Sequence, residues 1–149
     1  MSDDRVVYDR PEGYFLEDLS VGQSAEYART VTEADLVLFA GVSGDSNPVH
    51  MNEVYAKETM FKGRIAHGML VASLISATIA GKLPGPGSVY LGQNLKFRAP
   101  VRIGETVKAT VTVTDIDVAR KRVTLKTVCA VGDTVVIDGE ALIMVPARG

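Results

Sequence analysis

One helical stretch near the middle of the chain constrains the fold more than any other feature. Residues 69–80 are apolar nearly all round the predicted helix, so more than one of its faces must be covered by the rest of the protein. The stretch includes Ser73, Ser76 and Thr78, and it is shorter than the roughly 20 residues that a membrane-spanning helix needs. We therefore expect a helix buried in the core of a soluble protein, with no membrane partner.

The sequence after Pro84-Gly85-Pro86-Gly87 has the pattern of β-strands. Residues 107–114 alternate between apolar and polar side chains, which predicts a strand with one buried face and one exposed face. Polar turns then separate this strand from two more, so the three are expected to form an antiparallel meander. A further strand is expected before the meander, and another at the opposite edge of the sheet. The five predicted strands are 22–31, 88–97, 107–114, 123–131 and 134–145.

A shorter helix is predicted to begin at Thr32, where Asp35 completes a variant of the capping box. Gly41 and Gly44 are expected to end it. Residues 41–50 are rich in glycine, serine and asparagine and contain Pro48, which cannot sit inside a helix, so they predict a loop. A short helix over residues 52–57 is expected to follow.

This order of elements predicts a single α+β domain, a curved antiparallel sheet wrapped around one long helix. We place the domain at residues 21–149, after an N-terminal extension of residues 1–20. A chain of 149 residues is long enough to bury a core that needs no metal or disulfide.

Charge and cysteine content exclude several classes of protein. The formal net charge is −2 and the isoelectric point about 5.7, which argues against a nucleic-acid partner. Cys129 is the single cysteine and cannot form an internal disulfide, so a reducing compartment, the cytoplasm, is expected. The acidic start of the chain has no apolar run typical of a secretory signal. The glycines at 85–87 alternate with proline and predict a turn, not a nucleotide-binding loop.

Three polar side chains are the candidates for chemistry. Asp45 and His50 lie five residues apart around Pro48, and His67 precedes the long helix. Asp45 can alternatively be a turn residue with His50 as an incidental partner, and His67 a core histidine bonded to a backbone carbonyl. Zinc accepts all three residue types, but their separations follow no recognised ligand pattern, so we expect no metal.

Three segments together resemble the MaoC-like, (R)-specific enoyl-CoA hydratases of the hot-dog superfamily. These segments are Gly-Asp-Ser-Asn-Pro-Val-His (44–50), Ile-Ala-His-Gly-Met-Leu-Val-Ala-Ser-Leu-Ile-Ser (65–76) and Tyr-Leu-Gly-Gln-Asn-Leu-Lys-Phe-Arg-Ala-Pro-Val (90–101). The resemblance covers about residues 21–145. It implies the hot-dog fold, and a homodimer in which two sheets join into one.

The resemblance also implies an acyl-CoA substrate and a chemistry that uses neither metal nor redox cofactor. Asp45 and His50 would hold a water molecule and add it across a trans-2-enoyl thioester, with His50 as base and Asp45 as proton donor. The backbone N–H of Gly68 would stabilise charge on the thioester oxygen. Ser76 matches a serine that the family places near the pair, although it can equally be an ordinary helix serine.

Further residues are candidates for binding the substrate. Leu74 and Ile79 are core residues first, but they could also line an acyl tunnel. The cations Lys62, Lys96 and Arg98 could meet CoA phosphates. Asn47 and His67 complete the set, although Asn47 can instead shape the loop with its side chain.

Two other functions remain open from the sequence. Hot-dog thioesterases share the expected fold but commonly lack the loop from Asp45 to His50, and they would release free thiol without hydration. A non-catalytic, acyl-binding subunit of a heterodimeric dehydratase would not need to keep both residues.

Overall fold

The structure is a computed structural model that describes residues 13–149. In chain order its elements are the 3-10 helix η1 (Leu16–Asp18), β1 (Ser24–Thr30), α1 (Glu33–Ser43), α2 (Pro48–Met51), α3 (Glu53–Lys57), α4 (Gly68–Gly81), β2 (Val89–Phe97), β3 (Thr106–Asp117), β4 (Arg122–Val131) and β5 (Thr134–Met144). None of the described helices has the length and hydropathy needed to cross a membrane.

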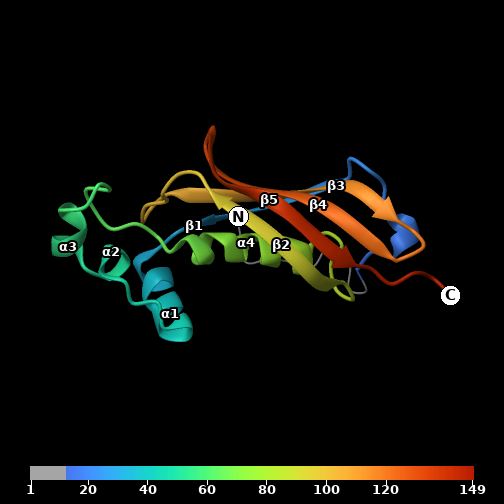
Figure 1. Ribbon diagram of the computed structural model, residues 1–149, viewed down its shortest axis with the longest axis horizontal. Coiled ribbons are helices and arrows are strands. Elements are labelled where there is room, and N and C mark those ends of the chain that lie inside the picture. Colours follow the sequence, from blue (N-terminus) through green and yellow to red (C-terminus); the bar gives the residue numbers. More distant parts are fainter. Residues whose placement is uncertain (1–12) are drawn as a thin grey trace, which may run out of the picture.

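The five strands form one antiparallel sheet in the order β1-β3-β4-β5-β2. The sheet curves along α4, while α1, α2 and α3 lie together beyond one end of it (Figure 1). The predicted α+β architecture is therefore confirmed, including the meander β3-β4-β5 and the placement of β1 at the edge opposite β2. This is the hot-dog arrangement that the sequence resemblance implies.

Packing between α4 and the sheet follows the predicted alternation. Val107, Ala109, Val111 and Val113 of β3 are each at most 1% exposed, and they belong to the same apolar core as Ile75 of α4. Along α4 an exposed stripe runs at helical spacing through Met69, Ser73, Ser76 and Ala80. Most of the helix is thus covered within one chain, and one narrow face is open.

Two details of the region around α1 correct the sequence-based expectations. Gly41 lies inside α1, and the helix ends at Gly44, whose φ of 82° is in the left-handed region that glycine adopts easily. Pro48 does not prevent a helix but is the first residue of α2, where its missing N–H has no helical partner to lose. The predicted loop 41–50 therefore shrinks to residues 44–47.

The capping interactions explain where these helices begin. Thr32 caps α1 by accepting a hydrogen bond from the backbone N–H of Asp35, and the Asp35 carboxylate accepts from the backbone N–H of Thr32, as the predicted capping box requires. Asn47 caps α2 by accepting from the Val49 N–H at 3.1 Å. Asn52 caps α3 by accepting from the Tyr55 N–H, so the predicted short helix is confirmed.

The predicted N-terminal extension falls mostly on residues 1–12, which lie outside the described residues. In the described part, Leu16 and Leu19 are buried in the core. The Leu16 N–H also donates to the Pro146 carbonyl at 2.8 Å. Residues 13–20 are therefore packed against the domain.

Candidate active site

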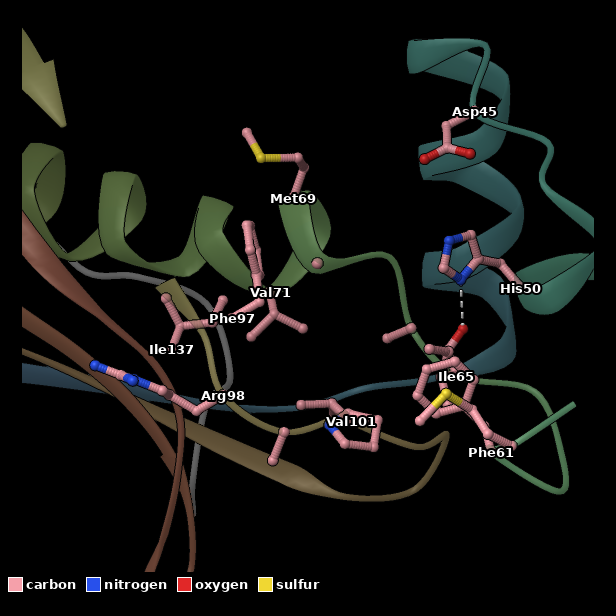
Figure 2. Close-up of a pocket in the computed structure, with 15 residues that line it drawn as sticks. Asp45, His50, Phe61, Ile65, Met69, Val71, Phe97, Arg98, Val101 and Ile137 are labelled. Atoms are coloured by element: carbon pink, nitrogen blue, oxygen red, sulfur yellow. Dashed lines mark hydrogen bonds between the residues drawn. The ribbon is translucent and has the colours of Figure 1, made fainter. Parts of the chain in front are cut away.

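A cavity of about 560 Å³ opens between the start of α4, the segment before it and the strand end at Phe97 (Figure 2). Its polar groups come from Asp45, His50 and Gly68, and Arg98 lies at its edge. The apolar lining consists mainly of Met60, Phe61, Ile65, Met69, Val71, Phe97, Val101 and Ile137. The combination of a mostly apolar wall with a few convergent polar groups is typical of a ligand site.

His50 is buried, and its hydrogen bond fixes which ring nitrogen is free. The imidazole Nδ1 lies 2.8 Å from the carbonyl oxygen of Ile65, and a carbonyl oxygen can only accept a hydrogen bond. In the neutral ring Nδ1 therefore carries the hydrogen, and Nε2 presents a lone pair. Arg64 holds the same residue from the backbone side, since its Nε donates to the His50 carbonyl at 2.6 Å.

Asp45 lies in the four-residue connection between α1 and α2. Its backbone N–H donates to the Ser43 hydroxyl, and one carboxylate oxygen accepts from the Asn47 N–H at 3.3 Å. The residue is exposed, and its carboxylate lies on the side of the His50 ring opposite Ile65 (Figure 2). The turn geometry considered for Asp45 is therefore present, and it directs the carboxylate toward the cavity.

His67 is a buried histidine that joins these two residues. Its Nε2 donates to the backbone carbonyl of Asp45 at 2.9 Å, and its ring stacks on that of His50 with centroids 4.0 Å apart. Burial lowers the pKa of His67, so the neutral ring is favoured. Nδ1 of this ring is buried and has no hydrogen-bond partner among the described residues.

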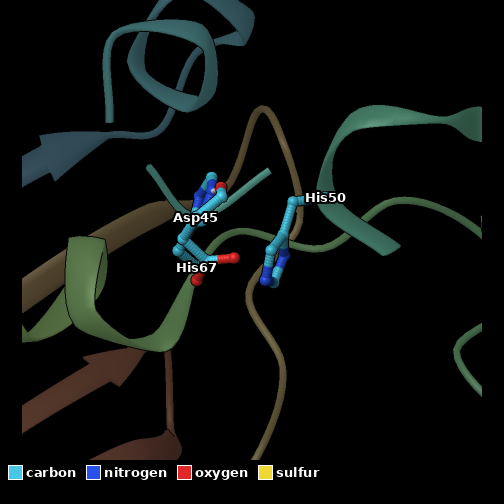
Figure 3. Close-up of side chains that lie close together, drawn as sticks. All are labelled: Asp45, His50 and His67. Carbon is cyan, nitrogen blue, oxygen red and sulfur yellow. Dashed lines mark hydrogen bonds between the residues drawn. The ribbon is translucent and has the colours of Figure 1, made fainter. Parts of the chain in front are cut away.

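Asp45, His50 and His67 thus meet at one place despite their spacing in the chain (Figure 3). One ligand atom from each lies within 4.8 Å of those of the other two. The three side chains therefore lie close together in the fold, although their spacing in the sequence matches no recognised metal-ligand pattern.

The start of α4 offers backbone donors beside this group. No described residue accepts a hydrogen bond from the N–H of Gly68, the first residue of the helix, and His67 provides no side-chain cap. The phenyl ring of Phe97 lies against Gly68, so close that a β-carbon there would be 2.7 Å from ring atom Cε1. A free helix N-terminus of this kind favours negative charge.

The other predicted site residues lie in different places. Arg98 lines the cavity edge and pairs with Asp138 at 3.2 Å, whereas Lys96 is exposed on β2 and is not part of the cavity lining. Asn47 shapes the loop, as the alternative interpretation held.

Ser76 and Ile79 line a separate hollow near Gly85 and Tyr90, and Leu74 lines a third hollow between α4 and α1. Within one chain, therefore, none of Ser76, Ile79 and Leu74 joins the lining shared by Asp45 and His50.

Two contributors were missed by reasoning from the sequence. The Ile65 carbonyl, which orients His50, is a backbone group and leaves no side-chain signal. Phe97 lies within residues 90–101, the third segment that resembles the MaoC-like hydratases, and its position next to Arg98 was the one sign in the sequence that it could belong to the site. Its contact with Gly68 is visible only in three dimensions.

Comparison with known proteins identifies the family. Residues 19–134 match the family described as the MaoC like domain. The chain belongs to the MaoC-like family. An (R)-specific enoyl-CoA hydratase of Rhodospirillum rubrum is 58% identical over 136 residues, covering 91% of this chain and 94% of that protein. A 3-hydroxybutyryl-CoA dehydratase of Methylorubrum extorquens is 48% identical over 134 residues, covering 90% of this chain and 85% of that protein.

The similarity extends to three dimensions. The structure of the R-hydratase PhaJ1 from Pseudomonas aeruginosa, in the unliganded form, superimposes on this MaoC-like chain with a TM-score of 0.85. The two sequences are 47% identical, and the match covers 91% of this chain and 88% of that one. The hot-dog fold is thus shared with a solved hydratase over nearly the whole domain.

Proposed function

We propose that this MaoC-like chain is a reversible (R)-specific enoyl-CoA hydratase, equally a 3-hydroxyacyl-CoA dehydratase. The observation that carries the proposal is the position of the Asp45 carboxylate beside the free Nε2 of His50, at an apolar cavity that begins at the N-terminus of α4. Relatives with hydratase and dehydratase names, similar over most of both chains, support the same reaction.

The proposed step needs one base and one acid. Nε2 of His50 takes a proton from water as the water oxygen bonds to C3, and the electron pair of the C2–C3 double bond moves to the thioester oxygen. Asp45, which starts the cycle as the neutral carboxylic acid, then donates its proton to C2 and the carbonyl re-forms. The proton on His50 passes back to Asp45 to reset the pair. The Ile65 carbonyl supports this order, because it keeps the hydrogen of neutral His50 on Nδ1.

Negative charge on the thioester oxygen requires a preorganised donor. The N–H of Gly68 is suited to this role, because it is free of partners among the described residues and lines the same cavity. The apolar walls would hold the acyl chain, and CoA phosphates would meet two exposed cations, Arg98 of the cavity lining and Lys96 of β2 outside it. The proposed chemistry needs no metal or redox cofactor, because water, a base and an acid are sufficient.

We also propose that the enzyme works as a homodimer joined at the edge strand β2. Val89, Tyr90 and Leu91 of this strand are each at least 40% exposed, which is unusual for an edge that meets only water. Ser76 and Ile79 line the hollow that includes Tyr90, so a second copy at this edge would cover them. In such a dimer they can serve the site of the partner copy.

One further expectation belongs with this proposal. The lone Cys129 is buried and free, which suits a reducing compartment, and we propose the cytoplasm. A thioesterase and an acyl-binding subunit remain the alternatives to a hydratase.

A single assay separates the three. Trans-2-enoyl-CoA substrates of increasing length are followed by loss of the enoyl absorbance, with the product coupled to an (R)-specific dehydrogenase. Hydration with coupling supports the proposal. Release of free CoA thiol without hydration would indicate the thioesterase, and binding without turnover would indicate the subunit.

A further inference from the structure

We propose that Asp45, His50 and His67 form a binding site for a divalent transition-metal ion such as Zn²⁺, and that the ion inhibits the enzyme when bound. The three side chains present two imidazole nitrogens and a carboxylate, with one ligand atom from each within 4.8 Å of the others. Two histidines and one carboxylate are a common protein ligand set for zinc, in which a fourth position stays open.

The hydrogen bonds of the two histidines prepare both rings for a metal. His50 donates through Nδ1 to the Ile65 carbonyl, and His67 donates through Nε2 to the Asp45 carbonyl. In the neutral form each ring therefore keeps one unprotonated nitrogen, Nε2 of His50 and Nδ1 of His67, and this is the form that binds metal. Metal-binding histidines almost always hold the second ring nitrogen in this way, against a backbone carbonyl or a carboxylate.

His67 provides a second, independent observation. Its Nδ1 is buried without a partner among the described residues, and the whole residue is only 1% exposed. A buried nitrogen lone pair of this kind costs free energy until something binds it. The hydratase step proposed above does not use this atom, so its role is unassigned.

Binding of an ion requires the ligand atoms to move closer together, and Asp45 can provide this movement. Zinc holds nitrogen and oxygen ligands at about 2.0–2.2 Å, so ligand atoms around one ion stand roughly 3.4 Å apart. The described separation of up to 4.8 Å must therefore close by rotation of side chains. Among the described residues the Asp45 carboxylate is exposed and held by the 3.3 Å hydrogen bond from the Asn47 N–H, whereas both rings are buried, so the carboxylate is the group expected to move.

A bound ion would block the proposed reaction directly. It would take the lone pair of His50 Nε2 and the carboxylate of Asp45, the two groups assigned to the water molecule. The inhibition thus rests on the proposed function, but the metal site itself does not.

The site is tested by titrating the chelator-treated protein with Co²⁺, whose visible absorption bands report its ligands. The protein must carry no polyhistidine tag, because His50 and His67 are its only histidines. Three variants remove one ligand each and keep its hydrogen bond: His50→Asn retains a donor toward Ile65, His67→Gln retains one toward the Asp45 carbonyl, and Asp45→Asn retains the acceptor for Asn47. Asp133→Asn, in the exposed turn between β4 and β5, is the matched control.

We expect one Co²⁺ per chain, displaced by Zn²⁺. Each ligand variant should weaken binding by more than the roughly 10- to 100-fold caused by losing a supporting hydrogen bond, and the control should bind as wild type. Circular dichroism verifies folding, and a folded variant from any one position is sufficient for the comparison. No saturable cobalt band, or equal binding by all variants, would overturn the site.

A second measurement addresses inhibition. Zn²⁺ should inhibit enoyl-CoA hydration at the concentrations that displace Co²⁺, with the inhibition relieved by rising substrate. Full activity of metal-saturated protein would overturn the inhibitory role. If the wild-type chain shows no hydration at all, the proposed function fails, while the cobalt titration still decides the metal site.

Discussion

The phenyl ring of Phe97 lies so close to Gly68 that a β-carbon on this glycine would be 2.7 Å from Cε1 and 2.8 Å from Cδ1 of the ring. Position 68 therefore favours glycine, because β2 and the start of α4 approach each other too closely there for a β-carbon to fit without a shift of the ring. The same approach places an aromatic wall beside the free backbone N–H that we assign to the thioester oxygen.

Replacing this glycine should disturb the site more than the fold. We expect Gly68→Ala to lower kcat/KM for crotonyl-CoA by about tenfold or more, because a displaced donor loses part of the 10²- to 10³-fold that such donors supply. Gly41→Ala is the matched control, since a β-carbon there meets nothing within 4 Å, and it should leave activity unchanged. Adding Phe97→Leu to Gly68→Ala should restore part of the activity. Equal rates for Gly68→Ala and wild type would remove this position from the mechanism.

The ion pair between Arg29 and Asp35 should make stability depend on pH. Burial alone would raise the pKa of Asp35, but the hydrogen bond from Arg29 at 2.8 Å and those with Thr32 outweigh it, so this pKa is lowered. Because the folded-state pKa is depressed, the stabilisation is present above the ordinary pKa of about 4 and is lost as the pH falls through the folded value.

We accordingly expect Asp35→Asn to reduce the free energy of unfolding at neutral pH by about 1–3 kcal/mol. The difference from wild type should shrink as the pH falls below about 4. Urea unfolding at several pH values measures both. A difference that stays constant into acid would show that the charge of Asp35 is not responsible.

The thiol of Cys129 should be unreactive toward thiol reagents in the folded protein. It is 0% exposed, and burial raises the pKa of its thiol to about 12. The reactive thiolate is thus both scarce and inaccessible. An aromatic disulfide reagent should modify Cys129 only at the rate of unfolding, with rapid reaction in urea. Fast modification of the native protein would contradict this burial.

The acyl-length range should respond to Ile79. If a second copy covers the hollow that Ile79 lines, Ile79→Val should raise activity on longer enoyl-CoA chains relative to crotonyl-CoA. Ile75→Val is the matched control, because Ile75 is also buried in α4 but lines none of the described hollows. It should change stability alone, by about 0.5–1.5 kcal/mol. An identical chain-length profile for both variants would place the acyl limit elsewhere.

The parts of the fold that the sequence predicted are those set by short-range patterns. Alternation over residues 107–114 identified the buried face of β3, and the pairing of Thr32 with Asp35 located the start of α1. The error at Pro48 has a physical cause, because proline breaks a helix interior but suits its first position.

The sequence was sufficient to predict the reacting side chains of the site, but not the backbone groups that orient them. The hydrogen bonds from His50 to the Ile65 carbonyl and from His67 to the Asp45 carbonyl span 15 and 22 residues. Any residue type presents the same backbone carbonyl, so neither partner can be recognised in the sequence. The cluster around the orphaned Nδ1 of His67 likewise exists only once the chain is folded.

The central claim is that Asp45 and His50 together activate water, and crotonyl-CoA hydration by Asp45→Asn and His50→Asn tests it most directly. Both variants keep their local hydrogen bonds, and Asp133→Asn serves as the control. We predict losses of about 10²- to 10⁴-fold in turnover for each of the two, with native circular dichroism and an unaffected control. Near-normal turnover in either folded variant would contradict the account.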